Sequence, residues 1–217
     1  MKQNLTDINV VLDRSGSMES VRTDTIGGFN AFLKTQKEAP GEATLTLAQF
    51  DDQYEIVHNG KNIQDVPNLT AETFVPRGMT ALLDAIGRTV NATGARLSAM
   101  PEDQRPGKVI FVILTDGQEN KSSEFTKAKI NEMIKHQKEA YRWDFVFLGA
   151  NQDAIHAGTS LGINAGNTMT YAANSKGTAA AFASVGATMC AYRSGASQAK
   201  NQFFSDEDRK KQKNAGA

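Results

Sequence analysis

This sequence has no excess of charge of either sign and almost no cysteine. Its 24 Lys and Arg residues balance 24 Asp and Glu residues, so the net charge is zero. A surface for nucleic acid or for an anionic membrane needs a basic excess, so we expect neither partner. Cys190 is the only cysteine, which excludes a disulfide within the chain. We expect it to be a small buried apolar residue and not a nucleophile.

Long apolar runs are also missing. No stretch of the sequence approaches the roughly 18 to 20 apolar residues that a membrane-spanning helix needs. Residues 1–4 lack the apolar segment of a signal peptide, so we expect a cytoplasmic, reducing location. The three histidines, His58, His136 and His156, show neither metal-ligand nor catalytic-triad spacing.

The pattern that is present predicts an α/β protein with one domain over residues 1–204. Six segments have the pattern of strands: about 7–12, 43–50, 54–57, 108–115, 143–148 and 168–171. Helical patterns separate most of them, which predicts a doubly wound, mostly parallel six-stranded sheet with helices on both faces. The hairpin of 43–50 and 54–57 predicts one antiparallel edge strand. Residues 59–79 look irregular, and we expect 205–217 to be a charged, disordered tail.

A short polar motif follows the first predicted strand. The apolar run 8–12 is followed directly by Asp13-Arg14-Ser15-Gly16-Ser17. Asp13, Ser15 and Ser17 place three hard oxygen donors on one loop, and Gly16 lets the backbone bend between the serines. Such a loop suits a divalent cation that prefers oxygen ligands, Mg²⁺ above all.

Two later segments carry matching oxygen donors. Thr80 precedes a helical pattern at 81–86, and Asp116 follows the apolar strand pattern 109–115. If the strand order is 3-2-1-4-5-6, the first and fourth strands are neighbours at the point where the sheet reverses its winding. Asp13 and Asp116 then meet at the carboxyl edge, where ligands bind in such sheets.

The elements D-x-S-x-S at 13–17, Thr80 and Asp116 together resemble the metal-ion-dependent adhesion site (MIDAS) of von Willebrand factor A (VWA) domains. The resemblance implies a Rossmann-like VWA fold. It also implies that Ser15 and Ser17 bind the metal directly, that Thr80 does so in the ligand-bound form, and that Asp13 and Asp116 bind mainly through water. Mg²⁺ is the expected ion, with Mn²⁺ or Ca²⁺ as alternatives.

The same resemblance implies a function in binding and not in catalysis. A protein partner would present an Asp or Glu that completes the coordination of the cation. The chain looks similar to small stand-alone bacterial or bacteriophage VWA proteins, including those linked to tellurium resistance and stress response. Other members of the wider family act beside AAA+ ATPases. We expect a monomer that joins such a partner or another complex.

Residues beside the motif are candidates for a partner-binding rim, namely Arg14, Arg77, Met79, Gln118 and Glu119. The two arginines are equally well explained as solvated loop residues. Ordinary surface polarity also explains Gln118 and Glu119. Met79 departs from the family, whose loop often reads Gly-Gly-Thr where this sequence has Gly-Met-Thr.

Two other readings of the sequence are a metal-dependent hydrolase or phosphoryl-transfer enzyme, and a scaffold subunit of a larger assembly. Phosphatases of the haloacid dehalogenase type need a second Asp where this chain has Ser15. Residues 158–162 match the nucleophile pattern G-x-S-x-G, but they follow a helical stretch where that motif needs a strand. The intact set of oxygen donors argues against a pure scaffold.

Overall fold

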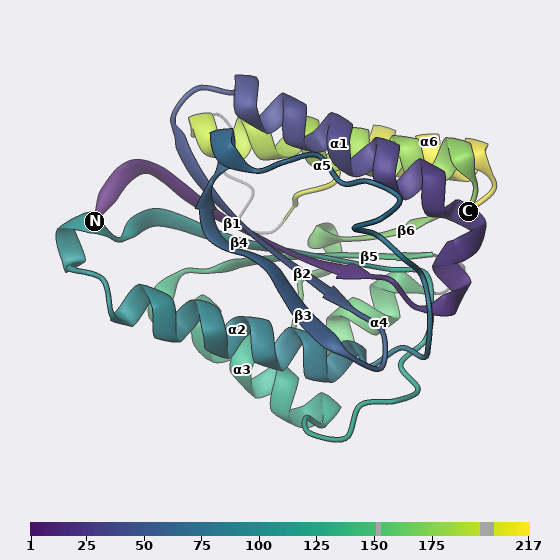
Figure 1. Ribbon diagram of the computed structural model, residues 1–217, viewed down its shortest axis with the longest axis horizontal. Helices are drawn as coiled ribbons and strands as arrows, with labels where there is room; N and C mark the ends of the chain where they lie inside the picture. Colours follow the sequence, from purple (N-terminus) through teal and green to yellow (C-terminus); the bar gives the residue numbers. More distant parts are fainter. Residues whose placement is uncertain (151–152, 196–201) are drawn as a thin grey trace.

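Six strands form one sheet in the order β3-β2-β1-β4-β5-β6, in a computed structural model that describes residues 1–150, 153–195 and 202–217 (Figure 1). The strands are β1 (Lys2–Asp13), β2 (Glu42–Phe50), β3 (Tyr54–Asn62), β4 (Pro106–Thr115), β5 (Asp144–Ala150) and β6 (Thr168–Tyr171). Only the β2–β3 pair of this sheet is antiparallel. The predicted doubly wound sheet with one antiparallel edge strand is therefore confirmed.

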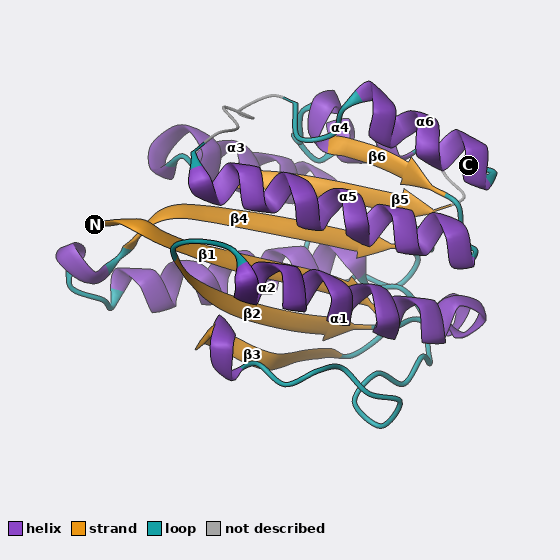
Figure 2. Ribbon diagram, turned by 90° about the horizontal axis from the view of Figure 1, so that it is seen from above, coloured by secondary structure: helices purple, strands orange, loops and turns teal. Residues whose placement is uncertain are grey.

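Helices cover both faces of the sheet (Figures 1 and 2). One face carries α1 (Arg22–Glu38) and α5 (Ser175–Ser194), and α6 (Asp206–Ala215) packs beside α5 and β6. The other face carries α2 (Leu82–Ser98), α3 (Lys127–Tyr141) and α4 (Ala154–Ser160). None of the helices in the described ranges is long and apolar enough to cross a membrane.

Alternating side chains of the central strands build two separate core layers. In β4, Ile110, Val112 and Leu114 pack into the layer under α1 and α5. Their neighbours Val109, Phe111 and Ile113 pack into the layer over α2 and α3. Because successive residues of a strand point to opposite faces, a strand covered on both sides must be apolar throughout. This requirement explains the continuous apolar pattern of the sequence at 109–114.

The parallel strands all end at one edge of the sheet, on the right in Figure 2. Leu12 of β1 pairs with Leu114 of β4, so the polar residues that follow these strands are placed side by side. This register brings the first and fourth strands together at the reversal point, as the sequence pattern predicted.

Three local expectations were wrong. Residues 59–62 continue β3 and are not irregular. The expected disordered tail contains helix α6, which begins with a capping box between Ser205 and Asp208 and buries Gln212 against α5 and β6. Cys190 is half-buried, with its sulfur 3.4 Å from Gln36 Nε2, so it is not a fully buried apolar residue. The sequence also has a helical pattern at about 151–161. Helix α4 begins at Ala154, and residues 151–152 lie outside the described ranges.

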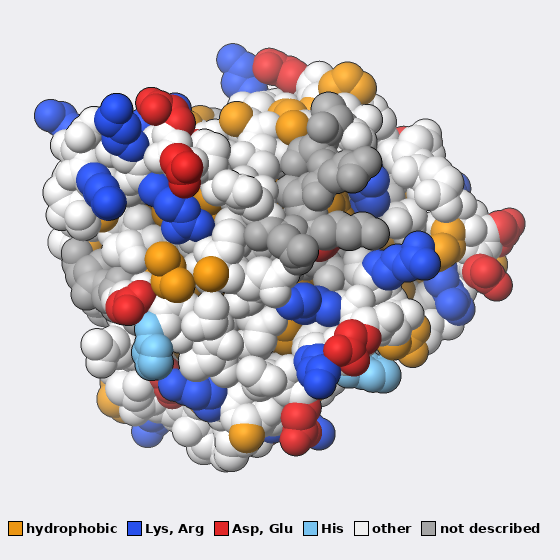
Figure 3. All heavy atoms as spheres, turned by 180° about the vertical axis from the view of Figure 1, so that it is seen from behind, with side chains coloured by type: hydrophobic (Ala, Val, Ile, Leu, Met, Phe, Trp, Pro, Cys, Tyr) orange, Lys and Arg blue, Asp and Glu red, His pale blue; other side chains and the backbone are white. Residues whose placement is uncertain are grey.

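The outer surface mixes charges of both signs. Figure 3 shows basic and acidic side chains interspersed with small apolar groups on the face turned away in Figure 1. This distribution agrees with the balanced composition of the chain.

Candidate metal centre

The loop after β1 is fixed by the carboxylate of Asp13. This side chain is fully buried, and its Oδ1 accepts a hydrogen bond of 2.6 Å from the backbone N–H of Ser15. Its Oδ2 accepts one of 2.5 Å from the hydroxyl of Thr115, at the end of β4. Asp13 therefore ties its own loop to the neighbouring strand.

Two serines connect this loop to Asp116. The Oγ atoms of Ser15 and Ser17 lie 3.1 Å apart. The Ser17 hydroxyl donates to Asp116 Oδ1 over 2.5 Å. Ser15 is buried, whereas Ser17 is exposed, so this group of oxygen atoms reaches from the interior to the solvent.

The loop of Thr80 is held by the loop that follows Asp116. The backbone N–H of Thr80 donates to Asn120 Oδ1 at 2.9 Å, and the Asn120 N–H donates to the Thr80 carbonyl at 3.1 Å. A further hydrogen bond, from the backbone N–H of Gly16 to the Gly78 carbonyl at 3.2 Å, joins the Thr80 loop to the serine loop. Gly78 has a φ of +65°, a conformation that favours glycine.

Three hydroxyl groups converge beside Gly117. A Cβ atom placed on Gly117 would lie 3.0 Å from Thr80 Oγ1, 3.6 Å from Ser17 Oγ and 3.8 Å from Ser15 Oγ. The absence of a side chain at Gly117 therefore keeps open the space that these oxygens face. Hydroxyl oxygens at such a point, with carboxylates next to them, are donors that Mg²⁺ and similar hard cations accept.

Burial raises the pKa of both carboxyls at the centre. The pKa of Asp13 rises to about 6, mainly because burial disfavours its charge, while hydrogen bonds from Thr115 and Ser15 oppose the rise. The pKa of Asp116 is raised for the same main reason and is lowered in part by Ser17. Within the described residues, neither carboxylate forms an ion pair with Lys, Arg or His. A bound cation would offset the cost of burying both negative charges. The residues at this centre therefore fit a cation site.

The donor set is unlike that of a histidine or cysteine site. Among the described residues, no three His, Cys, Asp or Glu side chains gather in a way that could hold a metal ion. Any cation at this centre would depend on neutral hydroxyls, with two carboxylates beside them. The hydroxyl ligands themselves would not neutralise the charge of such a cation.

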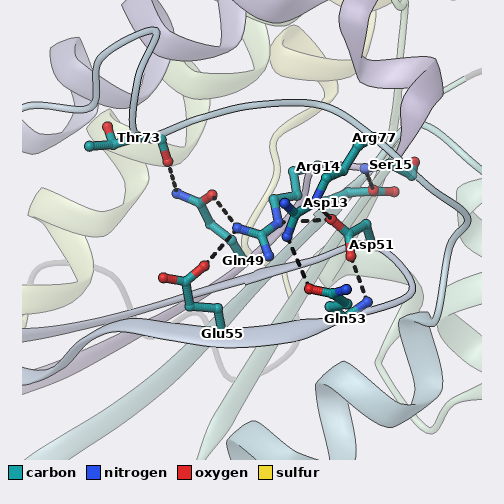
Figure 4. A network of polar contacts seen from close by, with 9 residues as sticks. All are labelled: Asp13, Arg14, Ser15, Gln49, Asp51, Gln53, Glu55, Thr73 and Arg77. Atoms are coloured by element: carbon teal, nitrogen blue, oxygen red, sulfur yellow. Dashed lines mark hydrogen bonds and ion pairs between the residues drawn. The ribbon is translucent and has the colours of Figure 1, made fainter.

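Arg14 is not at the rim of the centre, where the sequence analysis made it a candidate. Only 7% of it is exposed, and its Nε and Nη1 pair with Asp51 Oδ2 at 3.1 Å and Glu55 Oε2 at 2.8 Å (Figure 4). The Nε of Arg77 reaches the same Asp51 oxygen at 2.8 Å. Arg14 is thus neither a rim residue nor a solvated one. Arg14 and Arg77 both bind the buried carboxylate of Asp51.

The other rim candidates divide into two groups. Gln118 and Met79 are exposed, as a rim requires. Glu119 is instead turned toward its own loop and α2, because its carboxylate accepts from the N–H groups of Leu83 at 2.9 Å and Ser122 at 2.7 Å. It satisfies free donors at the start of α2 and shapes the loop.

Two residues that support the centre were missed from the sequence, namely Asp51 and Thr115. Thr115 could have been recognised from the sequence, since it is the one polar residue in the apolar run 109–115. Asp51 directly follows the strand pattern 43–50, and its position in the sequence indicates only a turn before the next strand pattern at 54–57. It does form that turn, accepting from the Gln53 N–H, but its second oxygen binds the arginines.

Comparison with known proteins shows which solved structures have a similar fold. No family model and no curated protein matches the sequence. Similar solved structures include proximal thread matrix protein 1 (PTMP1) from the mussel byssus with a zinc-occupied MIDAS motif, at 13% identity and a TM-score of 0.59 over 83% of this chain and 47% of that one. The von Willebrand factor domain of the pilus tip protein Mfa5 from Porphyromonas gingivalis matches at 12% identity and a TM-score of 0.57, over 85% of this chain and 94% of that one.

A third similar structure is the manganese-loaded TRAP protein of Plasmodium vivax, at 16% identity and a TM-score of 0.50, over 67% of this chain and 57% of that one. The present chain spans less than half the length of PTMP1. At these identities the likeness shows that the chain has the fold of VWA domains.

Proposed function

We propose that this protein binds a divalent cation, by preference Mg²⁺, through Ser15, Ser17 and Thr80, with Asp13 and Asp116 beside it. In this proposal the cation holds an Asp or Glu side chain of a protein partner. The observation that carries the proposal is the convergence of three hydroxyl oxygens on the space next to Gly117. Nothing in the packing of a buried core requires three hydroxyls to face one point.

The chemistry of the donors supports a role in binding. Neutral hydroxyls compensate little of a cation's charge, so a bound Mg²⁺ would supply an electrophilic position for an incoming carboxylate. Asp13 holds the serine loop in place through its bonds from Ser15 and Thr115. Asp116 holds Ser17 in the same way. The exposed Gln118 and Met79, with the half-exposed Arg77, would then contact the surface around the partner's acidic residue.

Two of the similar structures support the metal part of the proposal. The MIDAS motif of PTMP1 is occupied by zinc, and the TRAP protein is loaded with manganese. Mg²⁺ remains our choice because all of the donors here are hard oxygens. A partner of the AAA+ class or another large complex belongs to the same proposal.

A catalytic role has less support. The serine of the G-x-S-x-G match, Ser160, lies at the end of helix α4 and donates its hydroxyl to the Ala157 carbonyl at 2.7 Å. A nucleophile elbow needs a strand before that serine. We therefore propose binding, and not hydrolysis, as the function.

Selection from a random peptide library on the immobilised protein tests the proposal. Peptides are bound in Mg²⁺ and eluted with EDTA, and the double variant Ser15→Ala with Ser17→Ala serves as the control surface. We expect the eluted peptides to contain an Asp or Glu whose replacement by Asn or Gln abolishes binding. Peptides that stay bound in EDTA, or that lack an essential acidic residue, would contradict the proposal.

A further inference from the structure

A buried tyrosine hydroxyl near the proposed metal site has no hydrogen-bond partner among the described residues. Tyr171 is the last residue of β6 and is completely buried. A buried hydroxyl without a partner costs free energy, so such groups need an explanation. The other strongly buried tyrosine on this side of the sheet is Tyr192. Its hydroxyl does have a hydrogen-bond partner, since it donates to Asp144 Oδ2 at 2.7 Å.

Tyr171 lies near the carboxyl edge of the sheet, the edge that also carries the loops of the proposed cation site. It packs in the core layer under α1 and α5, together with Met18, which follows Ser17, and Leu114, which precedes Thr115. Thr115 pairs with Gly149 of β5, and the next β5 residue, Ala150, pairs with Tyr171. The tyrosine therefore lies at the same level of the sheet as the strand end that carries Asp116.

The carboxylates of the metal centre act on this phenol. Burial raises the pKa of Tyr171 well above its usual value, and the negative charges of Asp116 and then Asp13 raise it further. The phenol therefore keeps its proton at any physiological pH. It offers both an O–H donor and an oxygen acceptor to the buried side of the centre.

We propose that Tyr171 is a positioning residue of the metal site, and that its hydroxyl binds a water molecule of the cation's shell on the buried side of Asp116 and Asp13. This inference rests on the proposed cation site. Water bound to a cation is a strong hydrogen-bond donor, and the phenol oxygen is free to accept from it. Partners of this kind orient the ligands of a metal and change its affinity about tenfold or more.

Tyr171→Phe tests the inference because it removes one oxygen atom and leaves the ring. Calorimetric titration with Mg²⁺ and with Mn²⁺ measures the cation affinity, and thermal unfolding in EDTA measures the stability without metal. We expect the Kd of Tyr171→Phe to rise about five- to tenfold, the effect of one lost hydrogen bond or slightly more. Its melting temperature in EDTA should equal or exceed that of the wild type, because the removed hydroxyl has no partner there.

Tyr192→Phe is the matched control, since the same atom is removed from a tyrosine whose hydroxyl is bonded to Asp144. It should lower the melting temperature by several degrees and leave the Kd unchanged. An unchanged Kd in Tyr171→Phe, while the wild type binds the cation, would overturn the inference alone. So would a loss of stability in EDTA as large as that of Tyr192→Phe. Absence of binding in the wild type would overturn the cation site itself, and this inference with it.

Discussion

The hydroxyl of Ser17 donates to Asp116 Oδ1 over 2.5 Å, and this bond joins two loops that are 99 residues apart in the sequence. Together with the bond from Thr115 to Asp13, it connects both ends of the candidate centre to β4. The loops are thus already assembled by their own side chains. A cation entering this centre would have little loop ordering to accomplish, which favours affinity.

Gly117→Ala should block cation binding without unfolding the protein. The new Cβ would lie 3.0 Å from Thr80 Oγ1, so the threonine must move away from the point that the three hydroxyls share. We expect the Kd for Mn²⁺ to rise at least tenfold in a calorimetric titration, and the melting temperature in EDTA to change by only a few degrees. Gly94→Ala is the control, because its Cβ would have no atom nearer than 4.0 Å. Equal affinity in the two variants would contradict the assignment of Gly117.

Asp51→Asn should destabilise the fold strongly. The buried Asp51 oxygen is shared by Arg14 and Arg77, and the variant leaves Arg14 buried without this charge partner. Breaking a buried ion pair from one side costs about 3 to 5 kcal/mol. Urea unfolding measures the loss, and Glu124→Gln is the control, since its pair with Arg88 is half-exposed. That surface pair should contribute less than about 1 kcal/mol. A comparably small loss in Asp51→Asn would show that the network does not stabilise the loop.

The stability of the metal-free protein should depend on Asp13. The pKa of Asp13 is about 6 in the folded protein, against an ordinary value of 3.8 for an aspartic acid side chain. Between these values the folded state binds more protons than the unfolded state, so the free energy of unfolding falls as the pH rises through this window. The contribution of Asp13 should fall by about 3 kcal/mol.

Unfolding in EDTA from pH 4 to pH 7, compared with Asp13→Asn, isolates this effect from the other carboxylates. The variant should gain stability relative to the wild type as the pH rises. A difference that stays constant over this range would contradict the raised pKa of Asp13.

Ser205→Ala should loosen helix α6. The Ser205 side chain accepts from the backbone N–H of Asp208, whose carboxylate accepts in turn from the Ser205 N–H. Loss of such a cap costs about 1 kcal/mol. Hydrogen exchange of the α6 amides should accelerate about fivefold, the factor that corresponds to this energy. Ser98→Ala, which removes an exposed hydroxyl at the end of α2, should leave α6 exchange unchanged. Fully exposed exchange of α6 in the wild type would contradict this description of the helix.

The sheet could be predicted because each of its strands leaves a local mark in the sequence. The continuous apolar run at 109–114 and the alternation at 43–50 follow from burial on two faces or one. Asp13 and Asp116 could be brought together from the sequence because the strand order of such a fold limits where strand ends meet.

The burial of Arg14 and the presence of helix α6 were not predicted from local sequence patterns. The ion-pair partners of Arg14, Asp51 and Glu55, lie 37 and 41 residues away in the sequence, and no local pattern tells a buried arginine from a solvated one. Helix α6 buries a polar residue, Gln212, so its sequence lacks the apolar stripe of a packed helix. Its one local mark, Ser205 three residues before Asp208, is a capping signal and was overlooked.

Titration of the wild type and Asp116→Ala with Mg²⁺ and Mn²⁺ by calorimetry tests the central claim most directly. We predict saturable binding of one ion to the wild type and its loss in the variant, with both proteins folded by circular dichroism. Equal binding by both proteins would place the ion elsewhere. No binding by the wild type would contradict the claim that these hydroxyls and carboxylates form a cation site.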